Sequence, residues 1–160
     1  MSQSTLPRNP ETVGSTAQAT AFFLMMGVVI PGCVLFLIGI GEANAPQPSM
    51  ISLFAFGFAA LNSVVRFVVP TIIVNRAKAG LKEASGADQM SQLAGLYQTK
   101  IIVGMALLEG AALFNLIAYS LERHLWSYGV VAFLLGVMAI SFPSQGQFES
   151  WAEEMKRDLN

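Results

Sequence analysis

Residues 101–121 read IIVGMALLEGAALFNLIAYSL, a stretch of 21 residues in which Glu109 is the one charged side chain. A helix of about 20 mostly apolar residues is long enough to cross the roughly 30 Å hydrocarbon core of a bilayer. Three more apolar blocks accompany this stretch, at about 19–40, 50–74 and 125–142. The sequence therefore predicts an all-α membrane protein whose fold is a four-transmembrane-helix bundle.

The composition of the whole chain agrees with a lipid environment. Of 160 residues, 54% are hydrophobic and 12% are charged, whereas soluble domains carry about 25% charged residues. The net charge of −1 provides no basic field of the kind that attracts nucleic acid. Because Cys33 is the single cysteine, we expect neither an intramolecular disulfide nor a metal site with paired thiolates.

Motifs of enzymes and cofactor-binding proteins are absent from the sequence. It contains no phosphate-binding glycine loop, no nucleophile elbow and no zinc-ligand spacing. His124 lies in the short turn between the last two apolar blocks, where a solvated interfacial imidazole is the expected state. We therefore expect no metal, no cofactor and no catalytic residues.

Polar segments divide the chain into an N-terminal tail, a membrane domain and a C-terminal tail. Residues 1–18 are polar and are expected to be flexible on the cytoplasmic side. The membrane domain covers 19–142, and its polar stretch 75–100 has helical character with a turn near 85–88. The second and third spans are thus predicted to continue beyond the membrane as a cytoplasmic helical hairpin extension.

The C-terminal tail, residues 143–160, has the pattern of a cytoplasmic amphipathic helix. Ser144 and Gln147 have the spacing of a capping box at its start. One helical face then carries four apolar residues, namely Phe148, Trp151, Met155 and Leu159. The opposite face is mainly acidic, which argues against tight adsorption to anionic lipid. Two placements follow, one at the membrane interface and one packed against the chain's own loop or a protein partner.

Lysine and arginine residues predict the orientation in the membrane, because cytoplasmic loops retain an excess of positive charge. The predicted cytoplasmic side carries Arg8, Arg76, Lys78, Lys82, Lys100, Lys156 and Arg157. The opposite side carries Arg123, and there Tyr119, Trp126 and Tyr128 are expected to form an interfacial aromatic belt. We expect a multi-pass protein of a bacterial cytoplasmic membrane with both termini in the cytoplasm.

Two charged residues inside the predicted spans, Arg66 and Glu109, need a physical explanation. Each costs about 2.5 to 3.5 kcal/mol at a span centre on insertion scales. Arg66 lies nine residues before Asn75 and Glu109 lies nine residues after Lys100, so both are about 13 Å from the cytoplasmic ends of their spans. If the two helices pack as antiparallel neighbours, the guanidinium and the carboxylate are expected to form an ion pair.

Asn62 and Asn115 form a second predicted pair at matched depth. An interhelical hydrogen bond between such side chains contributes about 0.6 to 2 kcal/mol in membranes. For Arg66 and Glu109 two interpretations stay open. The pair is either a structural clamp that fixes the register of two helices, or Glu109 binds and releases a proton or ion while it is free of Arg66.

A resemblance to a known family lies in the run Gly104-Met105-Ala106-Leu107-Leu108-Glu109-Gly110-Ala111-Ala112-Leu113-Phe114. This run resembles the outer helix of the proteolipid c subunit of rotary ATP synthases. The resemblance implies that Glu109 is the proton-carrying carboxylate of a helical hairpin. The preceding helix departs from the family's pattern, since it contains Arg66 and lacks closely spaced glycines. As a whole, the chain resembles small bacterial four-span membrane proteins, which implies no particular activity.

We therefore expect a structural or accessory subunit of a membrane assembly rather than an enzyme. Its expected partners are the lipid bilayer and either another protein or further copies of the chain. The alternative is translocation of protons or ions through Glu109 in a c-subunit-like hairpin.

Overall fold

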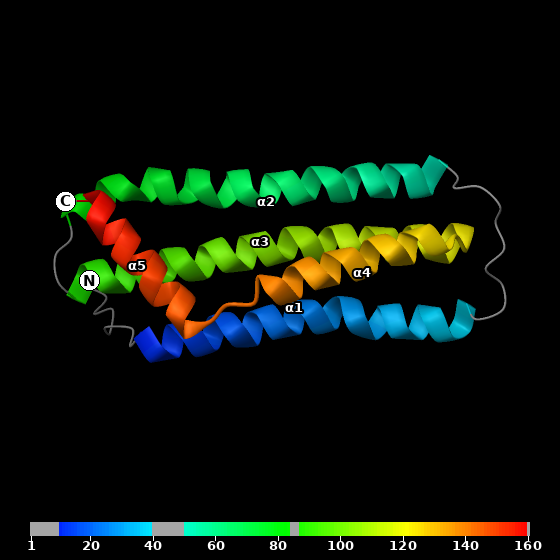
Figure 1. The fold of residues 1–160 in the computed structure, drawn as a ribbon, viewed down its shortest axis with the longest axis horizontal. Helices are drawn as coiled ribbons and strands as arrows, with labels where there is room; N and C mark the ends of the chain where they lie inside the picture. Colours follow the sequence, from blue (N-terminus) through cyan, green and yellow to red (C-terminus); the bar gives the residue numbers. More distant parts are fainter. Residues whose placement is uncertain (1–9, 40–49, 84–86, 160) are drawn as a thin grey trace, which may run out of the picture.

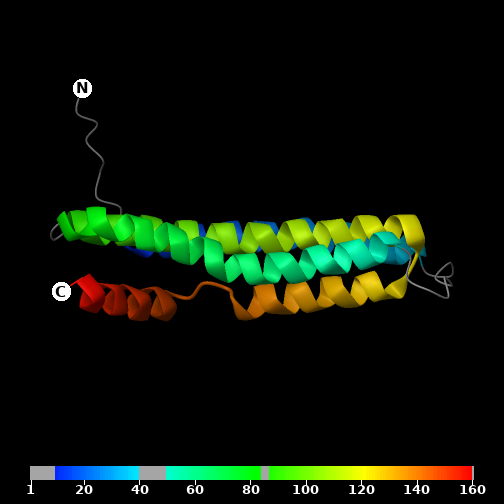
Figure 2. The same cartoon turned by 90° about the horizontal axis from the view of Figure 1, so that it is seen from above.

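The computed structural model describes residues 10–39, 50–83 and 87–159, and their regular elements are all α-helices. These elements are α1 (Pro10–Gly39), α2 (Met50–Glu83), α3 (Ala87–Glu122), α4 (Leu125–Ile140) and α5 (Gln145–Leu159). Figure 1 shows α1, α2 and α3 as long helices that lie side by side with α3 between the other two, and α2 runs in the opposite direction to α1 and α3. Viewed at 90° to this, α4 and α5 follow one another along one side of the bundle (Figure 2). The predicted all-α fold class is confirmed for the described residues.

Three of the helices are long and apolar enough to cross a membrane, over Ser15–Gly39, Met50–Lys78 and Asp88–Glu122. α4 is also apolar but has 16 residues, which corresponds to about 24 Å of helix. Large apolar side chains on these helices point outward, among them Phe23 at 72% exposed and Phe54 at 77%. An apolar surface of this extent suits lipid rather than water, in agreement with a membrane protein.

The helix boundaries extend beyond the predicted spans. α1 begins at Pro10, so residues 10–18 are helical rather than flexible as the sequence predicted. Proline is suited to the first turn of a helix, and Ala17 is fully buried in the bundle, so tertiary packing stabilises this polar segment. α2 and α3 include residues 75–83 and 87–100 of the polar stretch, in agreement with its predicted helical character.

Several sequence predictions concern residues outside the described part of the chain. They are the flexible tail over residues 1–9 and the first part of the hairpin turn, residues 84–86. The connection between the first two spans, residues 40–49, and the last residue, 160, also lie outside the description.

α3 is the helix on which the others pack. In its most apolar window of 18 residues 44% are buried, compared with 17% in α1 and 22% in α2. Its 36 residues extend about 54 Å. Because α4 has 16 residues and α5 has 15, neither covers this length alone. They cover it in succession, joined by residues 141–144 (Figure 2).

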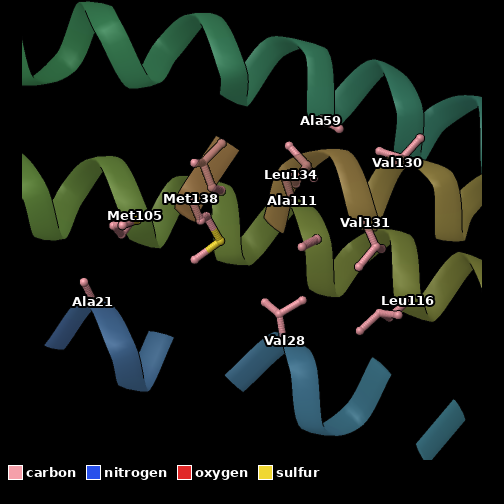
Figure 3. Packing of buried hydrophobic residues seen from close by; sticks show 12 residues of the cluster. Ala21, Val28, Ala59, Met105, Ala111, Leu116, Val130, Val131, Leu134 and Met138 are labelled. Carbon is pink, nitrogen blue, oxygen red and sulfur yellow. The ribbon is translucent and has the colours of Figure 1, made fainter. Parts of the chain in front are cut away.

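Three groups of buried side chains lie along α3. The largest group joins the apolar helices α1 to α4, and Figure 3 shows Val28, Ala59, Ala111 and Leu134 converging from α1, α2, α3 and α4. The second group joins α3 to α5 through aromatic rings. The Tyr97 ring lies 5.2 Å from Phe148 and 5.5 Å from Trp151, measured between centroids. Ile101 packs against both of these groups and so marks the junction between them.

The tail helix α5 packs on the protein itself. Its first turn is capped by Ser144, whose hydroxyl accepts a hydrogen bond from the Gln147 N–H at 3.3 Å. Its apolar face joins a further buried group made of Val74, Leu81, Leu93 and Met155. Lys78 of α2 pairs with Asp158 of α5 at 3.3 Å. Of the two placements left open by the sequence, these contacts agree with packing against the α2–α3 hairpin.

At the opposite end of the bundle, Tyr119, which was predicted for an aromatic belt, is buried, and Tyr128 beside it is half-buried. Tyr119 is 1% exposed and its ring centroid lies 4.2 Å from that of Tyr128. The Tyr128 hydroxyl donates to the Gly32 carbonyl of α1 at 2.9 Å. A Cβ on Gly39 would overlap the Tyr119 hydroxyl, so glycine permits this close approach of α1 and α3. The belt assignment of Tyr119 is therefore wrong, whereas Trp126 is 55% exposed.

Candidate functional site

Arg66 connects α2 to the end of α4. Its Nη2 donates a hydrogen bond to the Ser141 hydroxyl. That hydroxyl in turn donates to the Val137 carbonyl at 2.7 Å. The other terminal nitrogen of Arg66, Nη1, is buried and has no hydrogen-bond partner among the described residues. Arg66 thus joins two helices and still has unused donor capacity.

Glu109 faces α1 from its position on α3. Its Oε1 lies 2.6 Å from the point that a Cβ on Gly27 would occupy, so the carboxyl takes the space of a missing side chain. Pro31, four residues further along α1, has no N–H to donate to the Gly27 carbonyl. The half-buried carboxyl therefore lies against a turn of α1 in which one helical hydrogen bond is missing.

The predicted ion pair between Arg66 and Glu109 is not formed in the structure. Arg66 lies beside Gly104 of α3, where an added Cβ would be 3.9 Å from Arg66 Cγ. Gly104 and Glu109 are five residues apart, so they point about 140° apart around the helix. The prediction failed because it compared depth along two helices and had no information on rotation about their axes.

The predicted hydrogen bond between Asn62 and Asn115 is also not formed. Asn62 Nδ2 donates to the Phe58 carbonyl of its own helix at 2.9 Å. Asn115 Nδ2 donates to the Ala111 carbonyl at 2.9 Å and, across to α2, to the Ala55 carbonyl at 3.1 Å. Each amide therefore bonds to backbone carbonyls, and of these two residues Asn115 is the one that bonds across to another helix.

Glu122 makes a polar contact that sequence reasoning missed. Its carboxylate at the end of α3 accepts hydrogen bonds from the Ile51 N–H at 3.1 Å, the Ser52 N–H at 3.0 Å and the Ser52 hydroxyl. The first N–H groups of a helix have no acceptor within it, and its N-terminus favours negative charge. Glu122 thus caps α2. No local pattern indicates this contact, because Ser52 and Glu122 are 70 positions apart.

The cavities that border α2 include two with different linings. The first, which we call the basic hollow, has a volume of about 300 Å³ and is lined by Arg66, Thr71, Lys100 and Ser141 together with apolar residues. The second, which we call the apolar groove, has a volume of about 560 Å³ and lies between α2 and α4. Its small lining residues are Ala59, Ala60, Ser63 and Gly129.

Among residues 10–39, 50–83 and 87–159, no group of three or more His, Cys, Asp or Glu side chains has a metal-binding arrangement. Searches of protein families, of curated proteins and of solved structures find no match to this chain. Its function is therefore inferred from the polar contacts and from the two cavities.

We predict that Glu122→Gln lowers the free energy of unfolding by about 1 to 3 kcal/mol. The amide has one acceptor oxygen and no charge, so it accepts hydrogen bonds from the first N–H groups of α2 less well than the carboxylate does. Unfolding of the purified chain in mild detergent, titrated with a denaturing detergent, measures the difference. Glu149→Gln, at an exposed position of α5, is the control and is expected to change stability by less than about 0.5 kcal/mol. Equal stability of the two variants would contradict the capping role.

Proposed function

We propose that this chain is a four-span membrane protein that serves as a structural or accessory subunit of a membrane assembly. The supporting observation is the use of its polar side chains between helices. Arg66 bonds to α4, Asn115 and Glu122 to α2, and Tyr128 to α1. Side chains placed in this way hold helices together in lipid, where such bonds replace the missing hydrophobic driving force.

The fourth span in this proposal consists of α4 and the segment that follows it. The 16 residues of α4 supply about 24 Å, and residues 141–144 add the remainder of a roughly 30 Å hydrocarbon core. The Trp126 side chain, exposed near the start of α4, suits an interfacial position.

Charge distribution supports a cytoplasmic location for the end of the bundle that contains α5. The C-terminal part of α2, the N-terminal part of α3 and α5 lie together at this end (Figure 1). They carry Arg76, Lys78, Lys100, Lys156 and Arg157. By the positive-inside rule, both chain termini and the helical hairpin extension face the cytoplasm, as in a bacterial cytoplasmic membrane.

The apolar groove supports binding of a partner helix within the membrane. Ala60 and Ser63 of α2 and Gly129 of α4 line it, and small residues allow another helix to approach closely. A Cβ on Gly129 would meet no atom within 4 Å, so the groove is open at this position in the single chain. The proposed occupant is a transmembrane helix of another subunit or of a second copy.

Gly129→Leu is expected to abolish this assembly, because its side chain fills the groove without meeting its own chain. Affinity purification from native membranes in mild detergent, followed by size-exclusion chromatography and mass spectrometry, measures what stays bound. Gly110→Leu is the control, since its side chain also enters open space but on α3, which does not line the groove. A wild-type chain that elutes alone, without protein partner or second copy, would contradict the accessory role.

A second function, translocation of protons or ions through Glu109, is favoured by one observation. Glu109 is not neutralised by Arg66 and instead lies half-buried against Gly27 of α1. Ionisable residues inside membranes mark proton and ion paths in many transporters. The resemblance of residues 104–114 to the outer helix of c subunits is consistent with this use of the carboxyl.

If Glu109 carries protons, a hydrophobic carbodiimide labels it in native membranes, and labelling declines as pH rises. The reagent adds to protonated carboxyls, and a carboxyl that exchanges protons loses this form at high pH. Mass spectrometry of the labelled chain locates the adduct. Glu109→Gln should remove the label, whereas Glu122→Gln should retain it. Absence of labelling on Glu109 at every pH would rule out translocation through this residue and leave the accessory role unaffected.

A further inference from the structure

The basic hollow has the composition of a phosphate-binding site. Its lining includes two cations, Arg66 and Lys100. The hydroxyls of Thr71 and Ser141 also line it, but each donates its hydrogen to a carbonyl of the preceding helical turn, so the cations are the donors available to an anion. No carboxylate occurs among the described residues that line it. The neighbouring cavity of about 260 Å³ shares Lys100 but is also lined by Glu154 and Asp158, so it is less suited to an anion.

Neither cation forms an ion pair with a carboxylate of the described residues. Arg66 Nη1 is buried without a partner among the described residues, although Nη2 is engaged with Ser141. Lys100 Nζ lies 5.7 Å from the centroid of the Trp151 ring and forms no ion pair with a described carboxylate. Two positive charges that face one cavity repel each other, and a bound anion would relieve this repulsion.

The hollow results from the arrangement of helices. α4 ends at Ile140 and α5 begins at Gln145, so neither covers the α2–α3 surface at this level. Ile101, which packs against the buried groups on both sides of the junction, also lines the hollow. The site is therefore a break between two covering helices, and its position is fixed by where these helices end.

The position of the hollow along the bundle corresponds to the level of lipid phosphates. Arg66 is 16 residues from Met50, and Lys100 is 22 residues from Glu122. Arg66 therefore lies about 24 Å and Lys100 about 33 Å from the opposite end of the bundle. The hydrocarbon core is about 30 Å thick. The two cations thus lie on either side of the boundary between acyl chains and headgroups. Phe67, 69% exposed at the hollow, presents apolar surface to an acyl chain.

We propose that the basic hollow binds the phosphate of an anionic lipid headgroup from the cytoplasmic leaflet, with Arg66 and Lys100 as its cationic contacts. Basic pockets between membrane helices on this side are suited to such headgroups. The inference rests on the proposed membrane placement and is independent of both the accessory role and translocation through Glu109.

Native mass spectrometry of the full chain in mild detergent tests the proposal with three probes: dioleoylphosphatidylglycerol, dioleoylphosphatidylcholine and inorganic phosphate. We expect phosphatidylglycerol to bind more tightly than phosphatidylcholine and to resist displacement by inorganic phosphate. Lys100→Gln and Arg66→Gln should each weaken phosphatidylglycerol binding about fivefold. Arg76→Gln, which removes an exposed cation of α2 outside the hollow, is the matched control and should bind as the wild type does.

Lys100→Gln keeps the test valid even if Arg66→Gln does not fold, because Lys100 makes no hydrogen bond between helices among the described residues. Equal affinity of the wild type and Lys100→Gln for phosphatidylglycerol would overturn the proposal. Equal affinity for the two lipids, or ready displacement by inorganic phosphate, would also overturn it. Since binding is measured on the single chain, a negative result is distinct from failure to assemble with a partner.

Discussion

The length of α3 relative to the thickness of a bilayer is the constraint on which the structure depends. Its 36 residues extend about 54 Å, nearly twice the roughly 30 Å of a hydrocarbon core. One part of α3 therefore needs a neighbouring helix whose outer face is apolar and suits lipid. The other part needs a neighbouring helix whose outer face is polar and suits water. Apolar α4 covers the first part and amphipathic α5 covers the second, and Pro143 lies in the connection between them, where a helix cannot readily continue.

The polar residues of the bundle follow from the same constraint. In hydrocarbon, an unbonded polar group costs several kcal/mol, so Arg66, Asn115 and Glu122 each bond to a neighbouring helix. The groups that remain unsatisfied are the informative ones. Among the described residues they include Arg66 Nη1 at the basic hollow, the Tyr97 hydroxyl and Asn115 Oδ1, and the Glu109 carboxyl beside Gly27 makes no ion pair with Arg66.

The sequence predicted those features that depend on composition and periodicity. It predicted an all-α fold, the helical character that the structure describes over 75–83 and 87–100, and the apolar face of the tail that carries Phe148, Trp151 and Met155. It did not predict that α1 starts at Pro10, because the burial of Ala17 is a tertiary contact that the local composition does not reveal. The same is true of Tyr119, whose ring packs within the bundle.

The polar pairs were predicted incorrectly for a geometric reason. Counting residues gives the position of a side chain along its helix, but the rotation of each helix and the identity of its neighbours come from packing. Arg66 therefore meets Ser141 just beyond the end of α4, and Glu109 meets α1. The capping of α2 by Glu122 was missed because it joins positions 70 apart. Such contacts become visible only when the helices are placed in space.

The central claim is that the membrane boundary crosses α3 near Lys100. Residues Asp88, Gln92, Gly110 and Ile117 are all exposed on α3, so the chain itself shields none of them from water. Single cysteines at these positions, introduced after Cys33→Ser, can be treated with a membrane-impermeant maleimide in inside-out vesicles. Rapid labelling at 88 and 92, with none at 110 and 117, is the predicted result. Equal labelling at all four positions would contradict the claim.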